Sequence, residues 1–284
     1  MYELLGGKVR EAIPCYANGW FAPAKKAHEF AEKAKAAVAA GFHGLKWDPF
    51  GAAYLSIGRA ELRKAIECVE AVRAAVGPDI ELAVEGHGRF DIPTAVRIGR
   101  ELQPFDILWF EEPVPPDNLD ALAEVKHRAG VPIAAGERLY SRWEYQQFFQ
   151  KMPADFAQPD VSHVGGIFEL RCIAAQAEAL DLAICPHNPS GPVAMAATLH
   201  LAACTMNFFV LETMATDVAH RGKVSTERVA MENGMIRIPD GPGLGLDLDL
   251  AEIAKHPYQP HDLRHYTGAL TQIRPSDATS YFRP

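Results

Sequence analysis

Residues 81–87 decide the fold and read Glu-Leu-Ala-Val-Glu-Gly-His, a short apolar run that closes on the carboxylate of Glu85. Two later apolar runs also close on a carboxylate, at Glu111 and Glu137, and each lies 26 residues after the one before. Parallel strands need a crossover of at least a dozen residues, usually a helix, and this spacing leaves room for one. The segment therefore predicts successive βα units with a glutamate at each strand end.

The same alternation of short apolar runs and amphipathic, alanine-rich stretches extends along most of the chain. It predicts eight strands, at 12–17, 43–48, 81–86, 107–111, 132–136, 156–160, 182–186 and 208–212. It predicts seven helices between them, at 23–40, 58–76, 92–102, 117–129, 141–150, 165–179 and 191–204.

Eight strands in this alternation favour an α/β fold of the (β/α)8 TIM-barrel type over an open doubly wound sheet. No Gly-x-Gly-x-x-Gly motif follows the first strand, which argues against a dinucleotide site. The pattern changes after residue 222, where 234–238 is predicted to be a short strand and 239–245 is rich in turn residues. The expected organisation is a barrel domain at 1–225 and a C-terminal extension at 226–284.

Three glutamates on adjacent strands suggest a metal site. In a barrel of this type the carboxyl ends of the strands meet on one face, where active sites are built. Glu85, Glu111 and Glu137 would share a small volume there, and ionised carboxylates tolerate this when a cation neutralises them. Ligands that are all oxygen select a hard divalent ion such as Mg²⁺. Any one of these residues alone would more often be a solvated loop charge.

Two histidines and a lysine lie at or just beyond strand ends on the same face. Asp160 and His187 close neighbouring strands, where a hydrogen bond between them would fix the imidazole tautomer and make it a general base. His87 lies two residues beyond Glu85 and could move a proton at the opposite side of the site. Lys46 would add positive charge, although a lysine in this position could equally lie on the surface.

Composition excludes several kinds of partner. The 284 residues carry 28 basic and 36 acidic side chains, a formal net charge of −8 without any basic run, which argues against nucleic acid and anionic membranes. No apolar run approaches the ~20 residues of a membrane span. Five cysteines without a Cys-x-x-Cys pair, and a first segment without a signal-peptide pattern, predict a cytoplasmic protein.

The strand-end motifs, taken in order, resemble those of the enolase superfamily, specifically the mandelate racemase/muconate lactonizing enzyme family and its acid-sugar, galactonate-type dehydratases. They are Leu4-Leu5-Gly6-Gly7, Tyr16-Ala17-Asn18-Gly19, Lys46-Trp47-Asp48-Pro49-Phe50, Glu85-Gly86-His87, Phe110-Glu111-Glu112-Pro113, Gly136-Glu137, Gln158-Pro159-Asp160-Val161, His187-Asn188 and the turn-rich stretch 239–245. Each string alone is weak, but in this order they are highly specific and cover nearly the whole chain.

This resemblance implies a Mg²⁺-dependent sugar-acid dehydratase, which removes the proton α to a carboxylate and expels the β-hydroxyl through a metal-stabilised enolate. The implied metal ligands are Glu85, Glu111 and Glu137. The implied catalytic residues are His187 with Asp160 as the base, His87 as the acid and Lys46 as a fixed positive charge. The implied substrate-binding residues are Glu212, Asp48 and Asn18.

Two positions depart from the family pattern. The second strand often ends in Lys-x-Lys, with the second lysine acting as a base, whereas this chain has Asp48 there. A two-base racemase that uses this lysine is therefore disfavoured. The first metal ligand is usually Asp, and Glu85 is one methylene longer, which would shift the ion or its waters slightly.

The segment Leu4-Leu5-Gly6-Gly7-Lys8 resembles the point where the family's N-terminal capping domain meets the barrel. The chain is therefore expected to lack that cap, against which the C-terminal extension would pack. Three functions stay open: a sugar-acid dehydratase, a racemase or epimerase of a 2-hydroxy acid, and a non-catalytic binding barrel. A zinc hydrolase is disfavoured because no His-x-His closes the first strand. Analogy with related enzymes suggests a homo-oligomer.

Overall fold

Parallel strands form the centre of the computed structural model, which describes residues 1–215, 220–226 and 230–257. The strands are β1 (Ala12–Asn18), β2 (Gly44–Trp47), β3 (Glu81–Glu85), β4 (Trp109–Glu111), β5 (Ile133–Ala135), β6 (Phe156–Ala157), β7 (Ala183–Ile184) and β8 (Leu211–Met214). All eight overlap the predicted ranges, and most are shorter because the strand ends turn early into loops.

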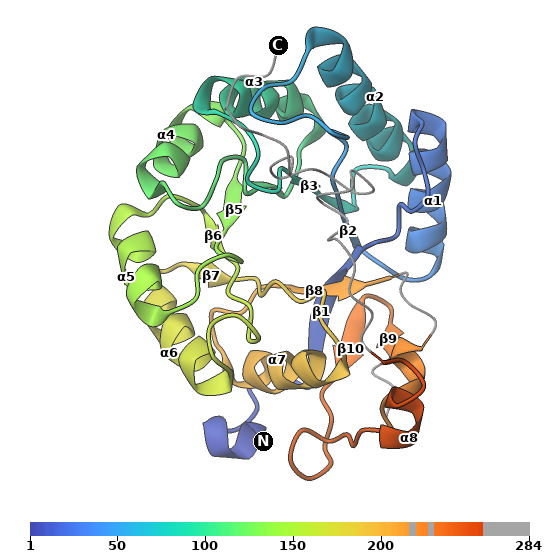
Figure 1. The fold of residues 1–284 in the computed structure, drawn as a ribbon, viewed down its shortest axis with the longest axis vertical. Coiled ribbons are helices and arrows are strands. Elements are labelled where there is room, and N and C mark those ends of the chain that lie inside the picture. The colour runs from blue at the N-terminus through green and yellow to red at the C-terminus, as the bar shows by residue number, and fades with distance from the viewer. Residues whose placement is uncertain (216–219, 227–229, 258–284) are drawn as a thin grey trace.

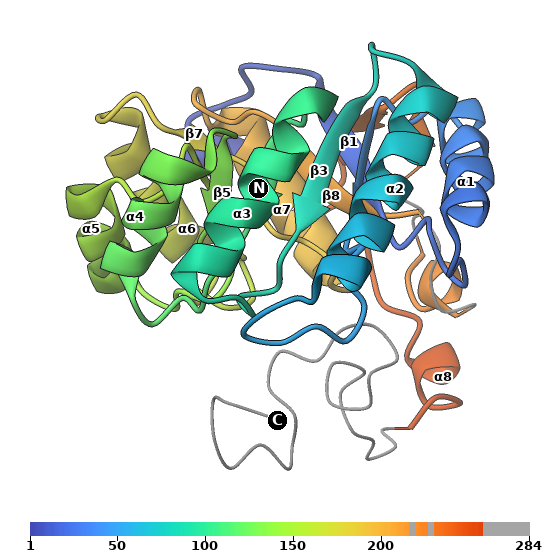
Figure 2. The same cartoon turned by 90° about the horizontal axis from the view of Figure 1, so that it is seen from above.

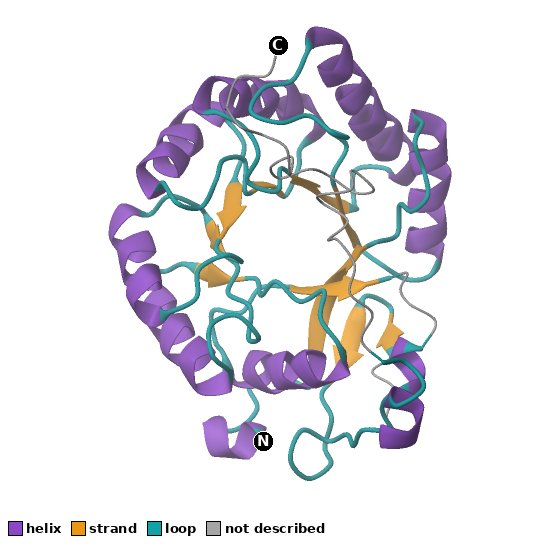
Figure 3. Ribbon diagram, in the orientation of Figure 1, coloured by secondary structure: helices purple, strands orange, loops and turns teal. Residues whose placement is uncertain are grey.

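Seven helices alternate with these strands and form the outer ring (Figures 1 and 3). They are α1 (Ala27–Ala39), α2 (Arg59–Val76), α3 (Ile92–Leu102), α4 (Leu119–Ala129), α5 (Arg142–Lys151), α6 (Ile167–Glu178) and α7 (Pro192–Cys204). Several begin where the sequence offers a cap: the side chains of Asp91, Asn118 and Ser141 accept hydrogen bonds from the first turns of α3, α4 and α5.

The strands follow one another around the ring in the order of the sequence. Parallel ladders join each strand from β1 to β7 to the next, and β8 pairs with β1. A single parallel bridge, Ile184–Phe208, joins β7 to the segment that leads into β8. This arrangement confirms the predicted barrel type, and it brings the carboxyl ends of all eight strands to one face.

The described residues after β8 differ from the preceding units. They contain a 3₁₀ helix at Arg221–Lys223, a hairpin of β9 (Met231–Glu232) and β10 (Met235–Arg237), and the short helix α8 (Leu250–Ile253). The predicted strand at 234–238 corresponds to β10, which pairs antiparallel with β1. Figure 2 shows α8 outside the ring of the other helices. Much of the predicted C-terminal extension, including all of 258–284, lies outside the described residues.

Two hydrophobic clusters support the face that carries the strand ends. The smaller lies inside the ring and comprises Tyr16, Ala83, Trp109, Ala134 and Cys185, each from a different strand or strand end. The larger fills the space between strands and helices. Alternate strand residues therefore point inward and outward, as in other closed sheets. Among the described residues, no helix is long and apolar enough to cross a membrane.

Candidate active site

The three predicted metal ligands meet at the carboxyl ends of β3, β4 and β5. Glu85 and Glu111 are paired across the β3–β4 ladder, and Glu137 follows β5. All three are buried, and each offers a carboxylate oxygen within 4.8 Å of the others. The closeness predicted from the sequence spacing is therefore present in the structure.

The donor set of these glutamates fits a small divalent cation. Oxygens that coordinate one Mg²⁺ at ~2.1 Å lie up to about 4.2 Å apart, so a 4.8 Å spread needs only small side-chain adjustments. Oε2 of Glu85 is buried, and its partner among the described residues is the ammonium of Lys46, with which it forms an ion pair at 3.2 Å. Burial, together with the charge of Glu85, raises the pKa of Glu111 well above its usual range. The three carboxylates thus form a site that a divalent cation could occupy.

Lys46, on β2, lies between carboxylates from three other strands. Its Nζ atom is 2.5 Å from Glu111, 3.0 Å from Glu212 and 3.2 Å from Glu85. Burial alone would lower the pKa of Lys46, but the charges of Glu111 and Glu212 outweigh burial and raise the pKa well above its usual range. The surface alternative for this lysine is therefore wrong, because its side chain is 3% exposed.

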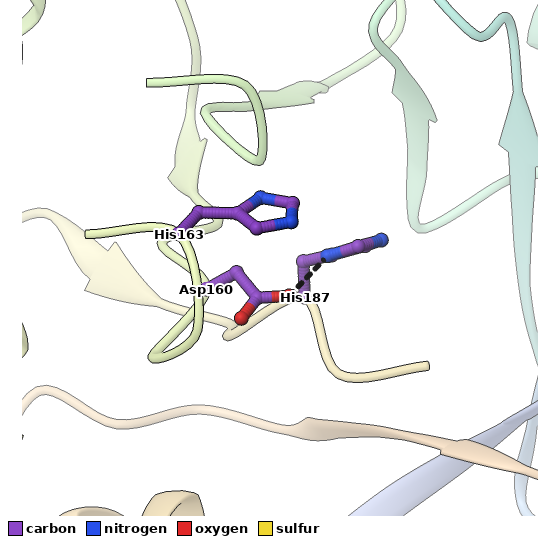
Figure 4. Close-up of side chains that lie close together, drawn as sticks. All are labelled: Asp160, His163 and His187. Atoms are coloured by element: carbon purple, nitrogen blue, oxygen red, sulfur yellow. Dashed lines mark hydrogen bonds and ion pairs between the residues drawn. The ribbon is translucent and has the colours of Figure 1, made fainter. Parts of the chain in front are cut away.

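His187 and Asp160 form the predicted pair after β7 and β6 (Figure 4). Nδ1 of His187 donates to Oδ2 of Asp160 at 2.7 Å, and the backbone N–H of Ser162 donates to Oδ1 of the same carboxylate. Because the carboxylate accepts at Nδ1, Nε2 is the ring nitrogen that faces the carboxylates, and it lies 3.4 Å from Glu137. Burial lowers the pKa of His187, but Glu137 and Asp160 outweigh burial and raise it to about 10. A cation bound by Glu137 would offset the contribution of that carboxylate and lower the pKa of His187.

His163, which the sequence analysis did not select, stands beside this pair (Figure 4). Its ring centroid is 5.8 Å from that of His187, and its Nδ1 atom donates to the backbone carbonyl of Glu137. The ring thus ties the β6 loop to the loop after β5. No signal in a single sequence marks this position, because His163 lies in the loop beyond the strand-end residue Asp160.

The sequence analysis also did not select Glu112 and Arg138 as site residues. Arg138 forms ion pairs with Glu112 and, at 3.2 Å, with Glu137. Burial raises the pKa of Glu112 to about 7 although Arg138 opposes the shift. Each of the two residues directly follows a predicted metal ligand in the sequence, which is the signal that could have selected them.

Glu212 lies within β8, and Asn18 ends the adjacent strand β1. The Asn18 amide donates to Oε1 of Glu212 at 2.7 Å, and the backbone N–H of Asn188 donates to Oε2 at 2.9 Å. Burial would raise the pKa of Glu212, but Lys46 and His187 outweigh burial and lower it. Glu212 is therefore held ionised beside Lys46.

His87 and Asp48 lie together after β3 and β2. Nδ1 of His87 is 2.6 Å from Oδ2 of Asp48, whose side chain is 4% exposed and also pairs with the buried Arg89. Asp48 was expected to bind substrate; in the structure its carboxylate contacts His87 and Arg89. Arg89 was not selected from the sequence, because an arginine two residues past a histidine carries no signal of its own.

The fold is a TIM-type barrel with a buried lysine and a His–Asp pair at the carboxyl face of its strands. The same face carries the carboxylate triad, Glu85, Glu111 and Glu137, which could hold a divalent cation. The family model described as "Enolase C-terminal domain-like" matches residues 29–253. The chain belongs to this family, as its motifs predicted.

Similar proteins of known name come from archaea and bacteria. The chain is 36% identical over 265 residues to a D-gluconate dehydratase from Thermoproteus tenax and 32% identical over 249 residues to a D-gluconate/D-galactonate dehydratase from Picrophilus torridus. These alignments cover 93% and 88% of the chain but 53% and 64% of the relatives. A mandelate racemase/muconate lactonizing enzyme-like protein from Rubrobacter xylanophilus has a solved structure with a TM-score of 0.82 and 36% identity, over 91% of the chain and 72% of that protein. The chain thus spans about half to two thirds of the named dehydratases.

Proposed function

We propose that the chain carries the active site of a Mg²⁺-dependent dehydratase that acts on a sugar acid, an aldonate or an aldarate. One observation carries the proposal: His187 follows β7 and His87 follows β3, these strands lie opposite each other in the ring, and the three glutamates lie at the ends of β3, β4 and β5. A base on one side and an acid on the other are what elimination of water requires. The names of the gluconate and galactonate dehydratases support the substrate class.

The first step is removal of the proton from C2 of the sugar acid by His187. Nε2 takes the proton, while Nδ1 keeps its hydrogen bond to Asp160, so the ring becomes an imidazolium held by a buried carboxylate. The electron pair left at C2 moves toward the substrate carboxylate. Lys46 holds a fixed positive charge on this side of the site, and Glu212 with Asn18 are the proposed contacts of the substrate carboxylate end.

The second step is loss of the C3 hydroxyl. His87 gives a proton to the departing oxygen, the C3–O bond breaks, and the electron pair from C2 forms the C2–C3 double bond. Water and an enol result, and the enol becomes the 2-keto-3-deoxy acid. Mg²⁺, held by Glu85, Glu111 and Glu137, would supply positive charge that lowers the free energy of the developing dianion.

The direct test is a screen of aldonic and aldaric acids, D-gluconate and D-galactonate among them, for the formation of 2-keto-3-deoxy acids. We expect turnover of at least one acid in the presence of Mg²⁺, loss of turnover in EDTA, and recovery when Mg²⁺ is restored, because the three buried glutamates repel one another without a cation. Absence of turnover by the full-length gene product with Mg²⁺, across the whole panel, would contradict the dehydratase assignment and favour a binding barrel.

The role of His87 distinguishes a dehydratase from an epimerase or racemase with the same fold. We expect His87→Asn to lower dehydration by about 10²-fold or more, because protonation of a leaving group contributes that much, while exchange of the C2 proton with solvent continues. Exchange in D₂O is followed by proton NMR. If inversion at C2 is the main reaction and His87→Asn leaves it unchanged, an epimerase replaces the dehydratase.

A further inference from the structure

The loop that carries His87 is fixed to the adjacent strand by its backbone. The N–H groups of Gly86 and Gly88 donate to the carbonyls of Glu111 and Glu112 at 2.8 and 2.6 Å. A Cβ at Gly86 would lie 2.8 Å from the Glu112 carbonyl oxygen, so only glycine allows this approach. His87 itself has φ +52°, an unfavourable value for a residue with a side chain. The surrounding contacts therefore impose this conformation on His87.

The carboxylate of Asp48 is already saturated with donors. Oδ1 accepts from the backbone N–H of Phe50 at 2.9 Å and from Arg89 at 2.9 Å, and Oδ2 accepts from Arg89 at 2.7 Å and faces Nδ1 of His87 at 2.6 Å. An ionised carboxylate offers about four acceptor sites, and all four are used. Asp48 thus has little capacity left for a substrate hydroxyl.

Arg89 holds this carboxylate rigidly. Its guanidinium is fully buried, and besides Asp48 it donates to the backbone carbonyls of Gly86, Gly51 and Ala53 at 3.0, 2.8 and 3.1 Å. It therefore links the loop after β2 to the loop after β3. A planar fork with five donors suits this arrangement, and lysine could not reproduce it.

We infer that Asp48, clamped by Arg89, is a positioning residue that accepts a hydrogen bond from Nδ1 of His87 and so favours the imidazolium form, whose second proton, on Nε2, is the one donated to the departing hydroxyl. An ionised carboxylate only accepts hydrogen bonds, so the 2.6 Å contact requires Nδ1 to be the donor. The site then contains two His–carboxylate pairs at opposite strands, Asp160–His187 for the base and Asp48–His87 for the acid. The inference rests on the proposed function for the role of His87 in elimination.

The substitution Asp48→Asn tests the polarity of this contact with almost no change in shape. Phe50 and Arg89 both donate to Oδ1, so the asparagine oxygen should occupy that position and the amide NH₂ should face His87, with loss of the second Arg89 hydrogen bond, to Oδ2. Nδ1 of His87 would then have to accept, so the ring would lose its Nδ1 proton and keep only the Nε2 proton, as a neutral imidazole that is a much weaker acid. Histidine-selective ¹⁵N NMR, with His87→Asn to assign the signals, should show a protonated Nδ1 in the native protein and an unprotonated Nδ1 in Asp48→Asn.

The kinetic measurements use D-gluconate and 3-deoxy-3-fluoro-D-gluconate with the Mg²⁺-loaded protein. We expect Asp48→Asn to lower kcat for dehydration by about 10²-fold with KM changed less than about threefold. Exchange of the C2 proton and release of fluoride should persist, because fluoride leaves without a proton. Asp91→Asn is the matched control, because Asp91 caps α3 two residues after Arg89 and asparagine caps equally well.

The inference can be overturned by the NMR measurement or by the kinetic measurements. An unprotonated Nδ1 in the native protein, or a protonated Nδ1 in Asp48→Asn, refutes the polarity of the contact. If dehydration, C2 exchange and fluoride release all fall together in Asp48→Asn, Asp48 has only a structural role. If KM alone rises, Asp48 binds substrate. The NMR measurement requires no turnover, so failure of the dehydratase assignment is distinguished from failure of this inference.

Discussion

Replacing His187 by asparagine should abolish both dehydration and exchange of the C2 proton, with each rate falling by about 10²–10⁴-fold. Both reactions begin with removal of the same proton, and the structure places Nε2 of His187 beside the carboxylate triad while Asp160 holds Nδ1. The measurement compares keto-acid formation with proton NMR in D₂O on one preparation. The result contrasts with His87→Asn, for which only dehydration is expected to fall.

The control for this substitution is His127→Asn, on the exposed side of α4. Surface substitutions of this kind normally change stability by less than about 0.5 kcal/mol, so activity should be unaffected. If His187→Asn retained C2 exchange at a rate close to native, another group would be the base and the Asp160–His187 pair would lose its assigned role. If the variant lost Mg²⁺ binding as well, the effect would instead arise from disturbance of Glu137.

The sequence predicts the barrel well because its signals are local. Each strand is a short apolar run, most of the helices have amphipathic periodicity, and α3 and α5 begin at a side-chain cap, Asp91 and Ser141. The region after β8 is less predictable. β9 and α8 are two and four residues long, and β10 pairs with β1 across more than two hundred residues, a contact that no local pattern encodes.

The residues of the candidate site also differ in how well the sequence predicts them. Glu85, Glu111 and Glu137 were predictable because strand-end spacing converts directly into proximity in a parallel barrel. Arg89 was not, because its importance depends on burial and on which carboxylate it reaches. Asp48 shows both cases in one residue. The sequence predicts that Asp48 lies at a strand end, but its contact with Arg89 follows only from three-dimensional packing.

Lys46 illustrates how the charges of the site depend on one another, and its removal should have the largest effect on stability. Lys46→Met should lower the free energy of unfolding of the metal-free protein by about 3–5 kcal/mol, because a buried carboxylate that loses its partner keeps its full desolvation cost. Chemical denaturation followed by circular dichroism gives this quantity. Lys35→Met, which breaks only an exposed pair with Glu32, should change it by less than about 0.5 kcal/mol.

A second substitution separates this charge effect from loss of packing. In Lys46→Met the glutamate nearest to the lost ammonium is Glu111, at 2.5 Å, so adding Glu111→Gln should restore part of the lost stability. Mg²⁺ should also stabilise Lys46→Met more than it stabilises the native protein, because the cation then replaces the positive charge that Lys46 supplied to Glu85 and Glu111. The double variant could instead be less stable than Lys46→Met, with no effect of Mg²⁺ on either variant. The lost stability would then arise from packing around the methylene chain of Lys46, and Glu85, Glu111 and Glu137 would not act as one charged site.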